Sequence, residues 1–238
     1  MIKVNNLSNT YISKKTSIKV LNDINLYCKK NEFVSIIGPS GCGKSTLFKI
    51  LSGLMNEYTG NFTMDKKVVY MHQNDNLMPW RTIYQNIILP YEIQNIEPNK
   101  NYISSLVKEF ELEGFMDMYP YQLSGGMKKR VALLRTYLTN REIMLLDEPF
   151  GSLDAITKRT MYSWLLKIWN NHKKTVLFIT HDIDEAIFLS DRIYVMGKRP
   201  ATIVGEITIN FKRPRNQEIL LGKQYLEYKD KLQTLLTK

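Results

Sequence analysis

The chain has 238 residues, and its 33 Lys and Arg against 23 Asp and Glu give a formal net charge of +10. Two cysteines are too few for a disulfide scaffold, which fits a reducing cytosol. No run of about eighteen apolar residues occurs and no long apolar run follows the first charges, so we expect a soluble protein that is not secreted. The basic charge fits a nucleic acid, an anionic membrane face or merely a lysine-rich proteome, and the scattered lysines point to no single face.

Residues 2 to 37 alternate apolar and polar side chains, which predicts short strands in an antiparallel layer. Tyr11 lies in this region. An aromatic ring shortly before a phosphate-binding loop can stack on an adenine face. The alternative is an ordinary surface or core tyrosine, since the chain has fourteen.

The stretch GPSGCGKST follows an apolar run at 33–37 and opens into a helical pattern. Its glycines allow backbone conformations that turn N–H groups around an anion, and the helix N-terminus faces the same anion. Lys44 supplies a mobile positive charge, and the Ser45 hydroxyl suits Mg²⁺. A glycine-rich turn is the alternative. The predicted phosphate-binding residues are Gly38, Pro39, Ser40, Gly41, Cys42, Gly43, Lys44, Ser45 and Thr46.

A short apolar strand at 67–71 ends at His72 and Gln73. A neutral amide at the carboxyl end of a strand can bind Mg²⁺ or orient a water molecule, which makes Gln73 a candidate for both roles. Taken alone, Gln73 also fits a simple turn. Just beyond it, the apolar residues 77–80, which end at Trp80, stand between polar stretches and predict a partner site, although packing of Trp80 inside the helical region is the alternative.

From residue 76 to about 138 the apolar residues repeat at helical spacing, which predicts an inserted helical subdomain. It contains LSGGMKKR, in which Ser124 is a good N-cap and Gly125 and Gly126 expose N–H groups at a helix start. These residues predict a second anion-binding helix end. A capped helix that begins at a glycine-containing turn is the alternative.

The fully apolar run 143–146 predicts a buried parallel strand that ends in two carboxylates. Ligands in open α/β sheets sit at such strand ends. Asp147 therefore suits the Mg²⁺ shell, and Glu148 suits a base that polarises water. A strand followed by an Asp-Glu-Pro turn is the alternative.

The C-terminal part reads as alternating helices and strands. A tight turn ends at Asp154 before a helix from 155 to about 169, and a buried strand at 175–180 ends at His181. His181 could hydrogen-bond a γ-phosphate, although a lone histidine is more often structural. The remaining predicted segments are a helix at 184–189, strands at 193–196 and 202–209, a basic segment at 212–215 and a C-terminal helix.

Taken in this order, the motifs resemble those of the nucleotide-binding subunit of an ABC transporter over nearly the whole chain. The resemblance implies that Tyr11 stacks on adenine, that residues 38–46 are the Walker A loop and that Gln73 is the Q-loop. It also implies the following assignments: Leu123–Met127 as the signature sequence, Asp147 as the Walker B carboxylate, Glu148 as the catalytic carboxylate, Ser152–Asp154 as the D-loop and His181 as the switch histidine. Met127 stands where many members have Gln, and we expect anion binding by Ser124–Gly126 to survive this change.

Within the family, LMPWRTIYQNI and the segment RPATIVGEITINFKRPR resemble importer ATPases for nitrate, sulfonates and taurine. Importers of thiamine precursors or other small heterocycles carry similar segments and remain an alternative. The resemblance implies ATP and Mg²⁺ as cofactors and a head-to-tail homodimer in which each ATP lies between one Walker A loop and the partner's signature helix. It further implies integral membrane permease subunits, an extracytoplasmic solute-binding protein and a peripheral location at the cytoplasmic face of the membrane.

The expected fold is α/β, with a P-loop NTPase core of the ABC ATPase type, an N-terminal antiparallel β layer and an inserted α-helical subdomain. One domain spans 1–238: residues 1–75 and 139–215 form the core, 76–138 the helical subdomain, and 216–238 a C-terminal helix. A soluble ATPase of this type that acts on nucleic acid is a rival, but its members resemble a core split by coiled coils or doubled, so we expect no nucleic acid partner. A non-hydrolysing subunit is disfavoured because Lys44, Glu148 and His181 are all present.

Overall fold

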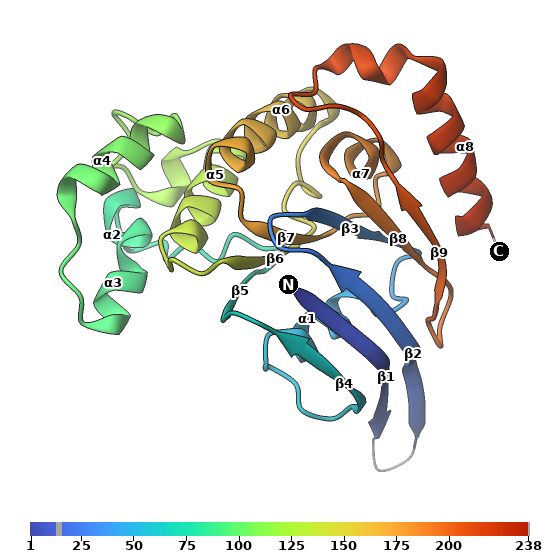
Figure 1. Cartoon of the computed structure of the whole chain (residues 1–238). Helices are drawn as coiled ribbons and strands as arrows, with labels where there is room; N and C mark the ends of the chain where they lie inside the picture. Colours follow the sequence, from blue (N-terminus) through green and yellow to red (C-terminus); the bar gives the residue numbers. More distant parts are fainter. Residues whose placement is uncertain (13–15, 238) are drawn as a thin grey trace.

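The computed structural model describes residues 1–12 and 16–237, and it is organised around two β-sheets (Figure 1). A six-stranded sheet has the order β5-β6-β7-β3-β8-β9, and a three-stranded antiparallel sheet has the order β2-β1-β4. All neighbours in the larger sheet are parallel except β8 and β9. The strands are β1 (Ile2–Ile12), β2 (Ser17–Cys28), β3 (Phe33–Ile37), β4 (Thr59–Met64), β5 (Val68–Met71), β6 (Ile143–Asp147), β7 (Thr175–Ile179), β8 (Arg192–Met196) and β9 (Ile203–Thr208).

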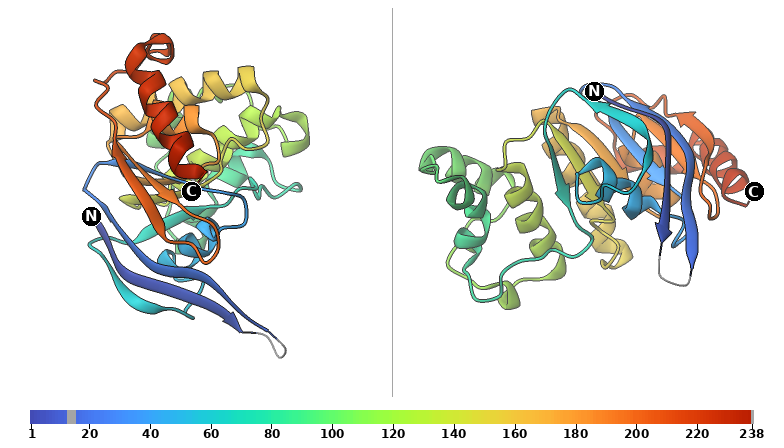
Figure 2. Two further views of the ribbon diagram at one scale, coloured as in Figure 1. Left: turned by 90° about the vertical axis from the view of Figure 1, so that its right-hand side faces the viewer. Right: turned by 90° about the horizontal axis from the view of Figure 1, so that it is seen from below.

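The helices cover both faces of the larger sheet (Figures 1 and 2). They are α1 (Lys44–Leu51), α2 (Ile83–Ile87), α3 (Leu89–Gln94), α4 (Lys100–Glu109), α5 (Gly125–Tyr137), α6 (Ala155–His172), α7 (Ile183–Leu189) and α8 (Lys223–Leu236), with short 3-10 turns at Pro120–Gln122 and Gln217–Leu221. No helix among the described residues is long and apolar enough to cross a membrane. The expected α/β class is confirmed.

Every residue of β3, β6 and β7 is buried. Because successive side chains of a strand point to opposite faces, an apolar strand of this kind must be covered on both sides. On one face, Leu47 and Phe48 of α1 pack with residues of the antiparallel sheet and with Leu145. On the other face, Phe33 and Phe178 pack against α6. The phosphate-loop helix therefore lies between the two sheets.

The N-terminal layer differs from the expectation in three respects. Its strands β1 and β2 are eleven and twelve residues long, not short. Residues 33–37 belong to the parallel sheet, where β3 pairs with β7 and β8. The third antiparallel strand is β4, which follows α1 in sequence and pairs with β1, so that Val4 lies opposite Phe62. Pairing between strands about 55 residues apart leaves no local signal in the alternation of side chains.

Helices α2, α3 and α4 lie together at one side of the molecule (Figure 1). Thr82 opens α2 with a capping box, in which its hydroxyl accepts from the Gln85 N–H and the Gln85 side chain accepts from the Thr82 N–H. The fully buried Asn86 side chain bonds Met78, Arg81 and Thr82 of the preceding loop. The division at residues 76 and 138 remains a proposal.

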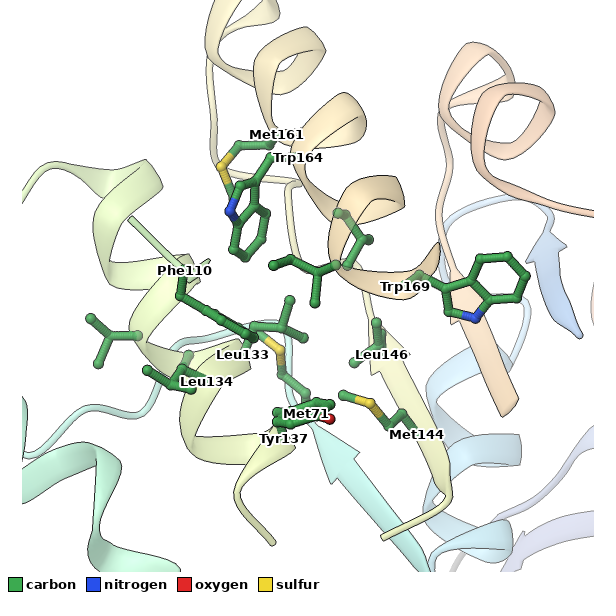
Figure 3. Packing of buried hydrophobic residues seen from close by; sticks show 14 of the residues in the cluster. Met71, Phe110, Leu133, Leu134, Tyr137, Met144, Leu146, Met161, Trp164 and Trp169 are labelled. Carbon is green, nitrogen blue, oxygen red and sulfur yellow. The ribbon is translucent and has the colours of Figure 1, made fainter. Parts of the chain in front are cut away.

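The largest apolar cluster joins this helical region to the sheet (Figure 3). Phe110 stacks edge-on against Trp164 of α6 with ring centroids 5.4 Å apart, and Tyr137 of α5 lies 6.0 Å from Phe110. Met144 and Leu146 of β6 complete the contact from the sheet side. Because α5 and α6 share this cluster, the helix that starts at the LSGGM segment is packed firmly onto the core.

Candidate functional site

The phosphate loop runs from the end of β3 to the start of α1, as the sequence predicts. Gly43 is the N-cap of α1 with φ 122°, and Gly41 has φ 74°, backbone conformations that residues with a Cβ rarely adopt. A Cβ on Gly43 would also lie 2.7 Å from Val20 Cγ1, and one on Gly38 would lie 2.7 Å from the Met196 carbonyl oxygen. The glycine spacing is therefore required by both the turn and the close approach of β2 and β8.

Lys44 is only 5% exposed, and its ammonium is folded into the loop. Lys44 Nζ donates to the Gly38 carbonyl at 2.8 Å and to the Pro39 carbonyl at 3.0 Å. A buried ammonium needs such partners, because burying it unpaired is costly. The loop therefore holds its positive charge at its own centre, where an incoming phosphate can replace the two carbonyls.

Asp147 ends β6 and is 4% exposed. Its Oδ2 accepts a hydrogen bond of 2.8 Å from the hydroxyl of Tyr70, which lies on the neighbouring strand β5. Burial and the Asp147 charge raise the pKa of Tyr70, so this hydroxyl stays a donor. Sequence patterns gave Tyr70 no role, because its contact depends on which strands are neighbours.

Gln73, Glu148 and His181 meet at the carboxyl ends of β5, β6 and β7. Glu148 Oε2 lies 3.1 Å from His181 Nδ1 and 3.4 Å from Gln73 Nε2. Glu148 has φ 44°, a left-handed conformation that costs a non-glycine residue on the order of 1–3 kcal/mol. Its N–H donates to the Ile179 carbonyl at 2.9 Å, which holds the residue in this conformation. The strain thus places the carboxylate between the amide and the imidazole.

Gln73 and Glu148 line one cavity of about 480 Å³ beside the phosphate loop, while His181 lies outside the lining. The Tyr11 hydroxyl lies 3.4 Å from Thr46 Oγ1, and the Tyr11 ring is 42% exposed. Arg199, from the turn between β8 and β9, donates to the Gly41 carbonyl. The described lining residues are Tyr11, Ile18, Val20, Ser40, Gly41, Gly43, Lys44, Ser45, Thr46, Gln73, Glu148 and Arg199, of which sequence reasoning missed Ile18, Val20 and Arg199.

The other predicted residues lie outside this lining. Ser124 is the N-cap of α5 and accepts from the Met127 N–H at 3.3 Å, while Gly125 is exposed and Gly126 is buried. Asp154 caps α6: its Oδ1 accepts from the Ile156 and Thr157 N–H groups, and these bonds together with the Thr157 hydroxyl lower its pKa. Within one chain, therefore, the structure does not bring the LSGGM segment to the phosphate loop.

The donor set beside the loop fits Mg²⁺ better than a transition metal. Among the described residues, no group of three or more His, Cys, Asp and Glu could hold a metal ion alone. Mg²⁺ is usually bound by one or two carboxylates together with substrate phosphates. The buried Asp147 and the exposed Ser45 next to Lys44 offer hard oxygen atoms of this kind, and the Gln73 amide is a third candidate.

A glycine loop between a parallel strand and a helix, with carboxylates at the end of a second parallel strand of the same sheet, defines a P-loop nucleotide-binding protein. A family model described as "ABC transporter" matches residues 21–151. The chain belongs to this family, as an ATPase cassette.

Among the relatives that are 42% identical to this chain are a sulfonate and a bicarbonate transport protein. The aliphatic sulfonates import ATP-binding protein SsuB of Bacillus thuringiensis subsp. konkukian aligns over 91% of this chain and 89% of SsuB. The bicarbonate transport ATP-binding protein CmpD of Synechococcus elongatus aligns over 95% of this chain and 87% of CmpD. A bacterial ABC transporter cassette solved as a dimer has a TM-score of 0.77 and 32% identity over 89% of this chain and all of that chain. The same cassette has also been solved as a dimer in a post-hydrolysis state, bound to ADP and Pi.

Proposed function

We propose that this chain is the ATP-hydrolysing subunit of an importer that takes up a small solute, such as nitrate, a sulfonate or taurine, through separate membrane subunits. The observation that carries the proposal is the meeting of Gln73, Glu148 and His181 beside the phosphate loop. The names of SsuB and CmpD, which refer to sulfonate import and bicarbonate transport, support a small anionic solute. Thiamine precursors and other small heterocycles remain the alternative solutes.

The site residues divide into binding and reacting groups. The loop 38–46 cradles the phosphates through backbone N–H groups, and Lys44 adds the charge that stabilises the transferred phosphoryl group. Ser45, Asp147 and Gln73 would hold Mg²⁺, which neutralises phosphate charge. Glu148 takes the role of the base that polarises the attacking water, and His181 and Gln73 orient its carboxylate.

The base side of the nucleotide fits the other end of the cavity. Tyr11 offers an exposed ring next to Thr46, and Ile18 and Val20 add apolar surface in the same lining. An exposed ring can stack on adenine without losing core packing. We therefore assign adenine to Tyr11 and the phosphates to the loop.

A second copy would complete the site. Ser124 and Gly125 are exposed at the start of α5 but lie outside the lining of the cavity, so they suit an anion presented by another chain. The dimeric form of the related cassette supports a head-to-tail homodimer. Asp154, whose carboxylate is engaged in capping α6, would act at this interface by fixing the turn at 151–154.

The membrane subunits would dock near the edge of β5. A groove of about 370 Å³ is lined by strand residues 68–71, loop residues including Asp75 and Asn76, and Leu89, Pro90 and Ile93 of the α3 region. We propose that a short cytoplasmic helix of a permease subunit occupies it, which would place the chain peripherally at the cytoplasmic membrane face, indirectly serving a solute-binding protein. Trp80 is 73% exposed, as a partner site requires, although it lies outside the groove lining, and Leu77 is buried in the core.

ATP hydrolysis by the purified full chain with Mg²⁺ tests the catalytic assignment. Lys44→Ala should lower the rate about 10²-fold by removing transition-state charge stabilisation. Glu148→Gln should lower it by about 10²–10⁴ and leave ATP binding intact. Glu142→Gln, an exposed carboxylate just before the same strand, is the matched control and should hydrolyse normally. Normal turnover in Lys44→Ala, or lost ATP binding in Glu148→Gln, contradicts the roles.

Uptake by the chain assembled with its membrane subunits tests the importer class. We expect a labelled small anion to accumulate only with ATP and wild-type Glu148, and competing nitrate, taurine or bicarbonate to identify the solute. Trp80→Ala should reduce assembly and uptake while ATP hydrolysis stays within a few fold, as loss of an interface anchor does. Recovery of the chain on nucleic acid instead of membranes would favour the rival ATPase.

A further inference from the structure

Side chains of helix α5 hydrogen-bond to the loop that carries Gln73. Lys129 is only 5% exposed, and its Nζ donates to the Gln73 carbonyl at 2.5 Å. One and a half turns further on, the Arg135 guanidinium donates to the Asp75 carbonyl at 2.6 Å and to the Asn76 carbonyl at 2.9 Å. Two cationic side chains of one helix thus hold three carbonyls of a four-residue segment.

The bonds to the Gln73 and Asp75 carbonyls are partly buried, whereas the bond to the Asn76 carbonyl is exposed. Burial lowers the pKa values of both Lys129 and Arg135, and the Asp75 charge opposes this effect in each case. A buried cation that loses its acceptor pays a desolvation cost that an exposed one does not. The segment 73–76 must therefore follow α5 when the helix moves, and the helix must follow the segment.

The two ends of this connection are chemically important. The N-terminus of α5 carries Ser124, and α5 packs on α6 and β6 through the apolar cluster in Figure 3. At the other end, the Gln73 amide lies 3.4 Å from Glu148 Oε2. A displacement of α5 would therefore change the distance between the Gln73 amide and the Glu148 carboxylate.

We propose that Lys129 is a positioning residue for Gln73: it couples the α5 helix that begins at Ser124 to the amide beside Glu148. Arg135 supports the same segment. In the head-to-tail dimer of the proposed function, on which this inference rests, nucleotide bound by one chain engages α5 of the other. The connection then adjusts the second chain's own hydrolytic site. Lys129 acts through the loop and does not touch nucleotide.

Lys129→Met, compared with Lys128→Met, tests this proposal. The two lysines are adjacent, but Lys128 is only half-buried, so it serves as a matched control. We expect Lys129→Met to lower kcat at least tenfold and to leave the Kd for a fluorescent ATP analogue within about twofold, because the nucleotide-binding residues are untouched. Lys128→Met should keep both values. Equal kcat in the Lys129→Met and wild-type chains, or a larger change in Kd than in kcat, overturns the proposal.

A double-mutant cycle with Gln73→Ala separates positioning from general destabilisation. If Lys129 acts through the Gln73 amide, Lys129→Met should cost less than about twofold in a chain that already carries Gln73→Ala. Multiplying losses would show an independent structural role and overturn the proposal.

If Lys129→Met does not fold, Lys129→Gln takes its place. Its shorter amide keeps a polar group but does not reach the carbonyl, so the same loss and the same coupling are expected, and unchanged kcat again overturns the proposal. A wild-type chain without ATP hydrolysis would instead contradict the proposed function itself.

Discussion

Arg199 shows how a single side chain can join a site from a distant part of the sequence. It stands in the turn after β8, yet its guanidinium bonds the Gly41 carbonyl and lines the cavity with Tyr11 and Ser45. The turn is brought there by β2, because Ala201 and Val20 are joined by a backbone hydrogen bond of 2.8 Å. Arg199 therefore adds a second cation to Lys44 in the lining of this cavity.

Arg199→Gln should raise the Kd for ATP about three- to tenfold, about 0.7–1.4 kcal/mol, since the exposed guanidinium is partly screened by solvent. Fluorescence titration with an ATP analogue measures this change, and the difference from wild type should shrink at high salt. Lys198→Gln is the control, because Lys198 is an adjacent exposed cation outside the cavity lining. An equal rise in Kd in both variants would show that the effect comes from net charge and not from the position of Arg199.

Glu185 makes the stability of the chain dependent on pH. It is 3% exposed, and burial raises its pKa to about 8, with Asp182 and Glu148 acting in the same direction and the Thr180 hydroxyl and Lys158 opposing. A folded pKa above the ordinary value of 4.5 means that the folded state binds the extra proton between these two values. The free energy of unfolding should therefore fall as the pH rises from about 4.5 to 8.

Glu185→Gln should remove this dependence. The amide carries no charge to desolvate, so the variant should gain stability relative to wild type at pH 8 and show little difference near pH 4.5. Urea unfolding across this range measures the effect. Asp184→Asn, which changes a half-exposed neighbour on the same helix, should keep the wild-type slope apart from its own contacts with Lys229 and Tyr225. A wild-type slope that persists in Glu185→Gln would contradict the assignment.

Among the elements, α7 is fixed at its C-terminal end by hydrogen bonds from the basic segment 212–215, which follows β9. The Arg215 side chain is fully buried, and its Nη1 donates to the carbonyls of Phe188 and Ser190 at 2.8 Å and of Ile187 at 3.3 Å. A cation at the C-terminus of a helix also meets the negative end of its dipole. Arg213 stacks on Trp169 at 4.2 Å and bonds Asp191. Two of the three cations of this segment, Arg213 and Arg215, therefore have structural partners.

Arg215→Met should destabilise the fold by about 3 kcal/mol, because it leaves buried carbonyls without a donor. The midpoint of urea unfolding should fall with little change in its slope. Lys212→Met, which removes an exposed charge from the same segment, should stay within about 0.5 kcal/mol of wild type. Similar losses in the two variants would assign the effect to net charge.

The elements that could be predicted from the sequence are those with a local signal. The strand that ends at Asp147 and the helix capped by Ser124 were found because burial periodicity and capping residues lie within a few positions. The predicted start of the C-terminal helix at residue 216 was wrong, because α8 begins at Lys223, after the 3-10 turn Gln217–Leu221. Strand β4 was missed because Thr59–Met64 is mostly exposed and only Phe62 and Met64 pack against the core.

The residues of the candidate site also divide into those that the sequence predicts and those that it does not. Lys44 and Glu148 stand in short motifs at strand ends, whereas the family resemblance assigned a role to His181, and the structure places Glu148 and His181 3.1 Å apart. Tyr70 and Lys129 could not be found, because each acts through a contact with a residue more than fifty positions away. Such contacts are set by strand order and helix packing, which short motifs do not encode.

For the whole molecule, the question is whether two chains share each nucleotide. Ser124 and Gly125 are exposed at the start of α5 and outside the cavity lining, so within one chain they have no part in the site. If they bind a phosphate held by a second copy, ATP must favour the dimer, because it binds the paired chains better than the separate ones. Glu148→Gln should accumulate this dimer with ATP, seen as a doubled mass in analytical ultracentrifugation.

Mixed dimers decide the arrangement with the same two substitutions placed in two ways. When one chain carries Lys44→Ala and its partner carries Ser124→Arg, head-to-tail sites predict that one site is damaged twice and the other is intact, so about half of the wild-type activity should remain. When one chain carries both substitutions and its partner is wild type, each site is damaged once and activity should fall close to background. Sites built within single chains predict the reverse, since the doubly substituted chain would leave its partner fully active. Because both mixtures contain the same substitutions, differences in folding or expression cancel in the comparison, and the order of the two activities alone tells which chain completes the site.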